Sequence, residues 1–229
     1  MPRLILPLLA CLVLAVAGCG SDDDDASTST AAATTSATET ADADTGCQTV
    51  PAAEPKAEKP EKPTKELTAS DDVTVTLETN CGAIPIKLDT TRAPKTASSF
   101  ASLAEQGFYD GLSFHRIVPG FVIQGGDPEG SGMGGPGYSI VEKPPADLAY
   151  TRGLVAMAKT AAEKPGTSGS QFFIVTGEDV GLPPEYALVG EVTGDGMATV
   201  DRIEATPINQ QTEQPESPVV ISKATVSGE

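Results

Sequence analysis

The chain has 229 residues, enough for one well-buried domain with additional segments. Its formal net charge of −17, from 32 acidic and 15 basic side chains, argues against binding to nucleic acid, which requires clustered lysine and arginine. With 23 glycines, 19 prolines and no tryptophan, the composition favours a turn-rich fold over a helical bundle.

The N-terminus has the pattern of a secretory signal that ends in a lipid-modification site. Arg3 supplies a positive charge, and the apolar run from Leu4 to Ala17 is too short to span a membrane but suits the hydrophobic part of a signal peptide. The small residues before Cys19 resemble the bacterial lipobox, at which the signal is cleaved and the new N-terminal cysteine is acylated. We therefore expect a lipoprotein signal peptide over residues 1–18, and lipid on Cys19 (palmitate or a similar acyl chain) that anchors the protein to the extracytoplasmic face of the cell membrane. The alternative is an ordinary secretory signal with a chance cysteine.

A tether is predicted over residues 19–70. Its first part, up to residue 46, is acidic and of low complexity, and its second part is rich in proline, lysine and glutamate. Apart from the cysteine in the signal and Cys19, the chain has Cys47 and Cys81. In an oxidising compartment such a pair is expected to form a disulfide, with two independent thiols as the alternative.

A folded domain is expected over residues 71–229. A helix is predicted from Pro94 to Gly107, because Ala97, Phe100 and Ala101 recur at helical spacing, and a shorter helix is predicted over 197–205. Many short strands with two helices predict a mainly β fold, either a closed barrel or a sandwich. The strands are expected as apolar runs between glycine and proline turns, over residues 73–77, 83–88, 113–118, 120–124, 153–158, 171–176, 186–192 and 218–226.

Two segments carry the functional prediction, Phe114–Asp127 and Gly169–Thr176. Both closely resemble the signature segments of the cyclophilins, and the resemblance extends from about residue 73 to the C-terminus. It implies a closed eight-stranded antiparallel β-barrel capped by two α-helices. It also implies a peptidyl-prolyl cis–trans isomerase that acts on proline-containing polypeptides and needs neither a cofactor nor a metal.

The chemistry of this reaction points to Arg116. Rotation about an X–Pro bond passes a twisted state at a barrier of about 18–20 kcal/mol, in which the proline nitrogen regains a lone pair. A guanidinium aimed at that nitrogen stabilises the twisted state more than the planar states. The resemblance adds Gln124 and Phe121 to the catalytic set. It implies substrate contacts from Phe173, Val122, Ala158, Lys159, Gln171, Leu182 and Tyr186.

Some residues keep other interpretations open. His115 is the single histidine, and a structural role beside Arg116 is favoured over a catalytic one. Gly130–Gly135 matches a dinucleotide-binding pattern, but without a strand-to-helix context it predicts a loop. For the whole protein we expect a monomeric isomerase that assists the folding of exported proteins at the membrane surface. The alternatives are a prolyl-peptide-binding module or holding chaperone with little turnover, and a structural surface lipoprotein.

Overall fold

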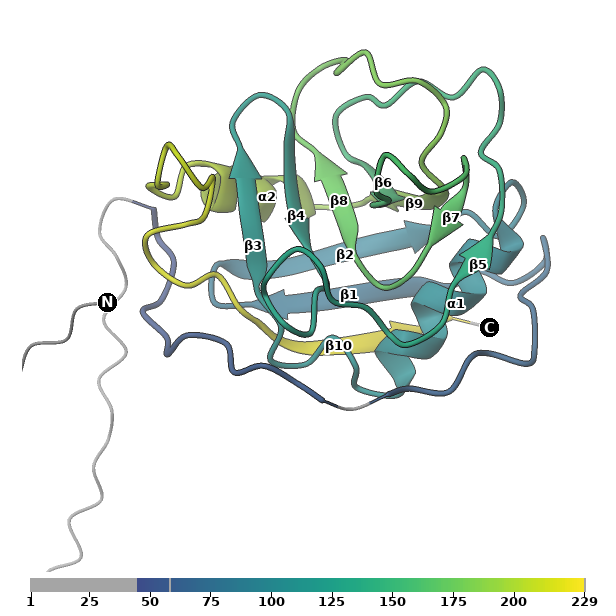
Figure 1. Ribbon diagram of the computed structural model, residues 1–229, viewed down its shortest axis with the longest axis horizontal. Helices are drawn as coiled ribbons and strands as arrows, with labels where there is room; N and C mark the ends of the chain where they lie inside the picture. The colour runs from purple at the N-terminus through teal and green to yellow at the C-terminus, as the bar shows by residue number, and fades with distance from the viewer. Residues whose placement is uncertain (1–44, 58, 229) are drawn as a thin grey trace, which may run out of the picture. The chain divides into compact units, whose positions relative to one another are not determined.

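Eight strands joined into one antiparallel sheet, with two helices, form the framework of the fold (Figure 1). The computed structural model describes residues 45–57 and 59–228, so the predicted signal peptide, Cys19 and the tether up to residue 44 lie outside the described residues. The helices are α1 (Pro94–Glu105) and α2 (Gly196–Glu204). The sheet strands are β1 (Thr74–Thr79), β2 (Gly82–Leu88), β3 (Phe114–Val118), β4 (Val122–Gly125), β6 (Leu154–Met157), β8 (Phe172–Val175), β9 (Leu188–Val192) and β10 (Ile221–Ser227). Two short strands not predicted from the sequence, β5 (Ile140–Val141) and β7 (Thr167–Ser168), form a separate pair.

The sheet is curled but open, so the predicted closed barrel is wrong. Its strand order is β10-β1-β2-β9-β6-β8-β4-β3, which leaves β3 and β10 at the two edges. Just before these strands, Ser113 and Val220 form one isolated bridge. Further along β3 the amide of Ile117 donates to the carbonyl of Glu213 at 2.8 Å. The edge of β3 is thus covered by the loop after α2, and this loop keeps β10 from pairing along it.

Strands β6 and β8, in the middle of the sheet, are apolar along their whole length because both of their faces are buried. In β8, Phe172 and Ile174 belong to the larger of two hydrophobic clusters, which we call the inner core. Phe173 and Val175 belong to the second cluster, on the other face of the sheet. We call this second group the outer cluster. It consists of Ala93, Val122, Leu148, Tyr150, Leu154, Ala156, Phe173, Val175 and Leu188. A continuous apolar run is the pattern expected for a strand covered on two sides.

Helix α1 packs its apolar stripe against the inner core. The ring of Phe100 lies 5.4 Å from that of Phe172 in an edge-to-face contact, which is a favoured arrangement for aromatic pairs. The helix ends before Gly107, whose φ of 67° is readily adopted only by glycine. Within the described residues, no helix is long and apolar enough to cross a membrane.

Residues 45–57 and 59–70, which we call the arm, run in extended conformation along the outside of the domain (Figure 1). The Lys56 ammonium donates to three backbone carbonyl groups, those of Gly107 at 3.1 Å, Phe108 at 3.3 Å and Asp110 at 2.8 Å. Further along, the amide of Leu67 donates to Ser98 Oγ of α1 at 2.7 Å. This part of the predicted tether is therefore held against the domain. Long-range polar contacts order it, and composition alone does not predict them.

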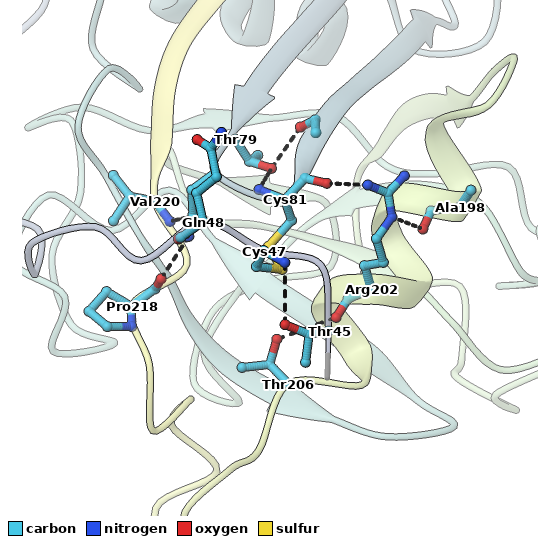
Figure 2. The surroundings of a disulfide bond; sticks show 12 residues. Thr45, Cys47, Gln48, Thr79, Cys81, Ala198, Arg202, Thr206, Pro218 and Val220 are labelled. Carbon is cyan, nitrogen blue, oxygen red and sulfur yellow. Dashed lines mark hydrogen bonds between the residues drawn. A yellow bond between two sulfur atoms is a disulfide. The ribbon is translucent and has the colours of Figure 1, made fainter. Parts of the chain in front are cut away.

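Cys47 and Cys81 are joined by a disulfide, the pairing that the sequence predicts (Figure 2). Their Cα atoms lie 4.1 Å apart, and both residues are buried in the inner core. Cys81 sits in the turn between β1 and β2, and its carbonyl accepts a hydrogen bond from Arg202 Nη1 of α2 at 2.7 Å. The disulfide thus attaches the start of the arm to the first hairpin of the sheet.

Candidate active site

The two signature segments lie side by side because β3, β4, β8 and β6 are neighbours in the sheet. In register across these strands, Arg116 is opposite Gln124, Gln124 is opposite Phe173, and Phe173 is opposite Ala156. Directly opposed residues of antiparallel strands place their side chains on the same face. A cation, an amide and an aromatic ring therefore lie in one row on the face that carries the outer cluster.

Gly126 allows the two segments to approach closely. Its φ is 83°, and a Cβ atom there would lie 2.5 Å from the carbonyl oxygen of Ser170. The Ser170 hydroxyl in turn donates to the Gly126 carbonyl at 2.7 Å. A side chain at position 126 would separate the segments, which explains why glycine is needed there.

Beside this row the outer cluster forms an apolar patch, which we call the pocket because partly buried side chains surround it. Val122 and Phe173 are nearly fully buried in it, and the rings of Phe173 and Tyr186 meet edge to face at 5.4 Å. The remaining predicted pocket residues are partly buried against the cluster, namely Phe121, Ala158, Leu182 and Tyr186. An apolar floor with a partly open rim is suited to a proline ring.

Tyr150 is a buried member of the outer cluster that holds Tyr186 in place, and sequence reasoning missed it. Its hydroxyl donates to the carbonyl of Tyr186 at 2.7 Å and accepts from the amide of Tyr186 at 3.0 Å. Burial raises the pKa of Tyr150 to about 12, so the hydroxyl keeps the proton that the first of these bonds needs. Tyr150 lies in a loop outside every predicted strand, and no pattern in the sequence distinguishes it.

A polar groove of about 450 Å³ adjoins the pocket. Gln124 Nε2 donates to Gln171 Oε1 at 3.0 Å, and Gln171 Nε2 donates to the carbonyl of Gly134 at 2.9 Å. The glycine-rich segment that resembles a dinucleotide motif is therefore a loop, as predicted, and its residues 132–135 line the groove. The other lining residues include Tyr138, Ala158, Lys159, Thr160, Glu163 and Ser170.

Lys159 lines the groove, and its whole side chain packs against the protein. The side chain is only 4% exposed, its ammonium lies 5.4 Å from the centre of the Tyr186 ring, and Glu185 is within 3.2 Å. At the neighbouring position, the amide of Ala158 donates to the carbonyl of Gln171 at 2.9 Å. This amide already has a partner within the protein, so only the other groups of these two residues are available for the predicted substrate contacts.

Arg116 has a partner that sequence reasoning also missed. Its Nε lies 2.6 Å from Glu213 Oε2, and the two side chains are 34% and 40% exposed. Among the described residues, Nη1 and Nη2 of Arg116 have no hydrogen-bond partner. The guanidinium is thus held by one edge, and its two terminal groups remain free to donate.

His115 is structurally unusual because both of its ring nitrogens are buried without a hydrogen-bond partner in the described part of the chain. Burial lowers the pKa of His115. The charge of Asp127 opposes this shift, and that of Arg116 adds to it. A neutral imidazole beside Arg116 fits the predicted structural role. Among the described residues, no group of histidine, cysteine, aspartate or glutamate side chains is arranged to hold a metal ion.

We expect the lowered pKa of His115 to make the fold less stable in mild acid. The folded state resists protonation of the ring, so stability falls as the pH drops below the value of about 6.5 at which an unfolded histidine takes up a proton. Thermal unfolding from about pH 7.5 to about pH 5.5 measures this loss. The variant His115→Asn should show a smaller decline, since the chain has no other histidine. An equal loss of thermal stability in the parent and in His115→Asn would show that the lowered pKa of His115 is not its cause.

Comparison with known proteins identifies the family. The family described as cyclophilin type peptidyl-prolyl cis-trans isomerase/CLD matches residues 74–226. The chain belongs to this family. The cyclophilin is 41% identical over 174 residues to peptidyl-prolyl cis-trans isomerase B of Streptomyces anulatus, a match that covers 69% of this chain and 98% of the relative. It is 39% identical over 171 residues to peptidyl-prolyl cis-trans isomerase A of Mycobacterium tuberculosis, covering 67% of this chain and 92% of the relative.

A solved structure agrees with the fold of this cyclophilin. A cyclophilin type peptidyl-prolyl cis-trans isomerase of Cryptosporidium parvum superposes with a TM-score of 0.63 at 32% identity, covering 69% of this chain and 99% of the other. The predicted resemblance is confirmed, and with it the mainly β cyclophilin fold. The enzyme catalyses the cis–trans isomerisation of X–Pro peptide bonds.

Proposed function

We propose that isomerisation takes place over the pocket of the outer cluster, with Arg116 stabilising the twisted state. The observation that carries this proposal is the row of Arg116, Gln124 and Phe173 across three paired strands. Phe173, with Phe121 and Leu182 at the rim, receives the proline ring, and Gln124 binds a carbonyl of the substrate. A related Cryptosporidium parvum structure, 31% identical, was determined in the presence of the dipeptide Ala-Pro, which supports a proline-containing peptide as ligand.

The reaction needs no proton transfer or covalent intermediate. As the C–N bond twists, the proline nitrogen becomes pyramidal and recovers its lone pair. An Arg116 Nη group donates to this lone pair, an interaction that the planar amide offers only weakly. The donor therefore favours the transition state over both ground states, and the barrier falls.

We further propose that the protein acts on exported polypeptides at the outer face of the membrane, as a lipid-anchored monomer. The apolar run before Cys19 and the small residues next to it support export and acylation. The Cys47–Cys81 disulfide supports an oxidising compartment, because such bonds do not persist in most cytosols. One chain supplies every residue of the pocket, which is consistent with a monomer.

The lipid anchor is tested by replacing Cys19. Cys19→Ser is expected to abolish labelling by a fatty-acid probe and to leave either an uncleaved precursor or a soluble secreted protein. Cys11→Ser, within the signal, is the matched control and should be labelled like the parent. Equal labelling of the parent and the Cys19→Ser variant would rule out the anchor.

The client class is tested by the refolding of an exported reporter protein whose slow phase is limited by an X–Pro bond. The uncatalysed phase takes roughly tens to hundreds of seconds. The parent enzyme should shorten it at substoichiometric concentration, whereas a holding chaperone would slow it or act only at equal concentration.

A further inference from the structure

The tip of the loop between α2 and β10 presents Glu213 to β3. Ile208 and Pro215 form an isolated bridge that closes the loop. Asn209 then organises its tip through four bonds. Its amide donates to Gln214 O at 2.9 Å, its carbonyl accepts from Glu213 N at 2.8 Å, and its side-chain oxygen accepts from Gln211 N at 2.9 Å and Thr212 N at 3.2 Å.

Glu213 then docks on β3 with both its backbone and its side chain. Its carbonyl accepts from the amide of Ile117 at 2.8 Å, and its Oε2 accepts from Arg116 Nε at 2.6 Å. Its φ of 58° is the only positive value at a non-glycine position among the described residues. This left-handed conformation is unfavourable for a glutamate, so glycine or asparagine would suit the backbone better. The side chain present there thus comes at a conformational cost.

The contact between Glu213 and Arg116 does little for stability, because ion pairs as exposed as this one contribute little to folding. Its effect is on the geometry of Arg116. An arginine side chain has several rotatable bonds, and an unrestrained guanidinium would occupy many orientations above the pocket. The carboxylate binds Nε, and the two Nη groups have no hydrogen-bond partner among the described residues.

We propose that Glu213 is a positioning residue for isomerisation, holding the Arg116 guanidinium in the orientation from which it donates to the twisted X–Pro nitrogen. The proposal rests on the role of Arg116 given above. Pre-orientation of a catalytic group lowers the barrier without adding affinity for the planar substrate. The loss of Glu213 should therefore reduce kcat and leave KM nearly unchanged.

Two substitutions at this position separate positioning from folding. Glu213→Asn suits the left-handed backbone but is one methylene shorter and cannot reach Arg116. Glu213→Gln keeps the length and an oxygen acceptor for Nε while removing the charge. Glu216→Asn, at an exposed position of the same loop, is the matched control.

NMR exchange spectroscopy on a short X–Pro peptide measures turnover on the enzyme separately from peptide affinity. We expect Glu213→Asn to lower kcat about five- to tenfold, with KM within about twofold. Glu213→Gln should retain at least about half of the parent kcat, and Glu216→Asn should match the parent. The thermal midpoint of Glu213→Asn should equal or exceed that of the parent.

A double-mutant cycle with Arg116→Ala completes the test. If Glu213 acts through Arg116, Glu213→Asn should cause no further loss in the Arg116→Ala background. The positioning role is overturned if Glu213→Asn has the parent kcat, if it raises kcat by freeing Arg116, or if its loss persists without Arg116. Should Arg116→Ala itself turn over at the parent rate, the role of Arg116 fails first, and this outcome is distinct from the other three.

Discussion

Arg116→Ala is expected to lower kcat/KM by at least about tenfold and to leave the fold intact, since removal of a transition-state donor from an enzyme commonly costs a factor of this size or larger. Arg116 lies on β3 with a partly exposed side chain, so its truncation creates no cavity in the inner core. Its contribution is concentrated in the twisted state, and the loss should therefore appear mainly in kcat. A protease-coupled assay on a short X–Pro peptide measures it.

Two further variants sharpen this result. Arg116→Lys should restore little activity, because an ammonium on a flexible stem cannot contact Glu213 and present a second donor group in one plane. Arg92→Ala removes an exposed arginine that pairs with Asp89 and takes no part in the row of Arg116, Gln124 and Phe173, so it should behave like the parent. Unchanged circular dichroism together with parent turnover in Arg116→Ala would show that the proposed mechanism is wrong.

Removal of the Cys47–Cys81 disulfide is expected to lower the free energy of unfolding by up to about 3–4 kcal/mol, the chain-entropy value for a loop of this length. The two cysteines are 34 positions apart, and the bond restricts the unfolded chain over that span. Lys56 and Leu67 still hold the later part of the arm to the domain, so the loss falls below this value only by the freedom that the start of the arm gains in the folded protein without the bond. A domain of this size should then melt about 5–10 °C lower.

The double variant Cys47→Ser/Cys81→Ser tests this by thermal unfolding, with the parent in reductant as the control for the substitutions themselves. Both samples should melt at the same lower temperature. Isomerase activity should stay within about twofold of the parent, since the disulfide adjoins the β1–β2 turn and α2, whereas the pocket is built on other strands. An unchanged melting temperature would show that the arm constrains the domain without the bond.

Much of the site was predictable because its residues belong to two short segments with local constraints. The first segment forms the edge strand β3 and its neighbour β4, and the second forms β8, where burial on both faces goes with a continuous apolar run; glycine marks the turns and close approaches. Arg116, Gln124 and Phe173 are proposed as site residues because these two segments resemble the cyclophilin signatures, whereas an apolar run by itself would place Phe173 in the core. The eight sheet strands and the two helices follow from the spacing of apolar residues, and the pairing of Cys47 with Cys81 is expected because they are the two cysteines that remain in an oxidising compartment.

Other features depend on contacts between distant parts of the chain. Glu213 meets Arg116 across 97 positions, and Tyr150 meets Tyr186 across 36, and neither glutamate nor tyrosine stands in a pattern that singles it out. The loop that carries Glu213 also covers the edge of β3. Eight strands suggest a closed barrel, but with this loop along β3 the sheet stays open. Local sequence specifies which segments become strands and helices, because propensity and burial act over a few residues. The partners of a long polar side chain are decided only when the tertiary structure brings their backbones together.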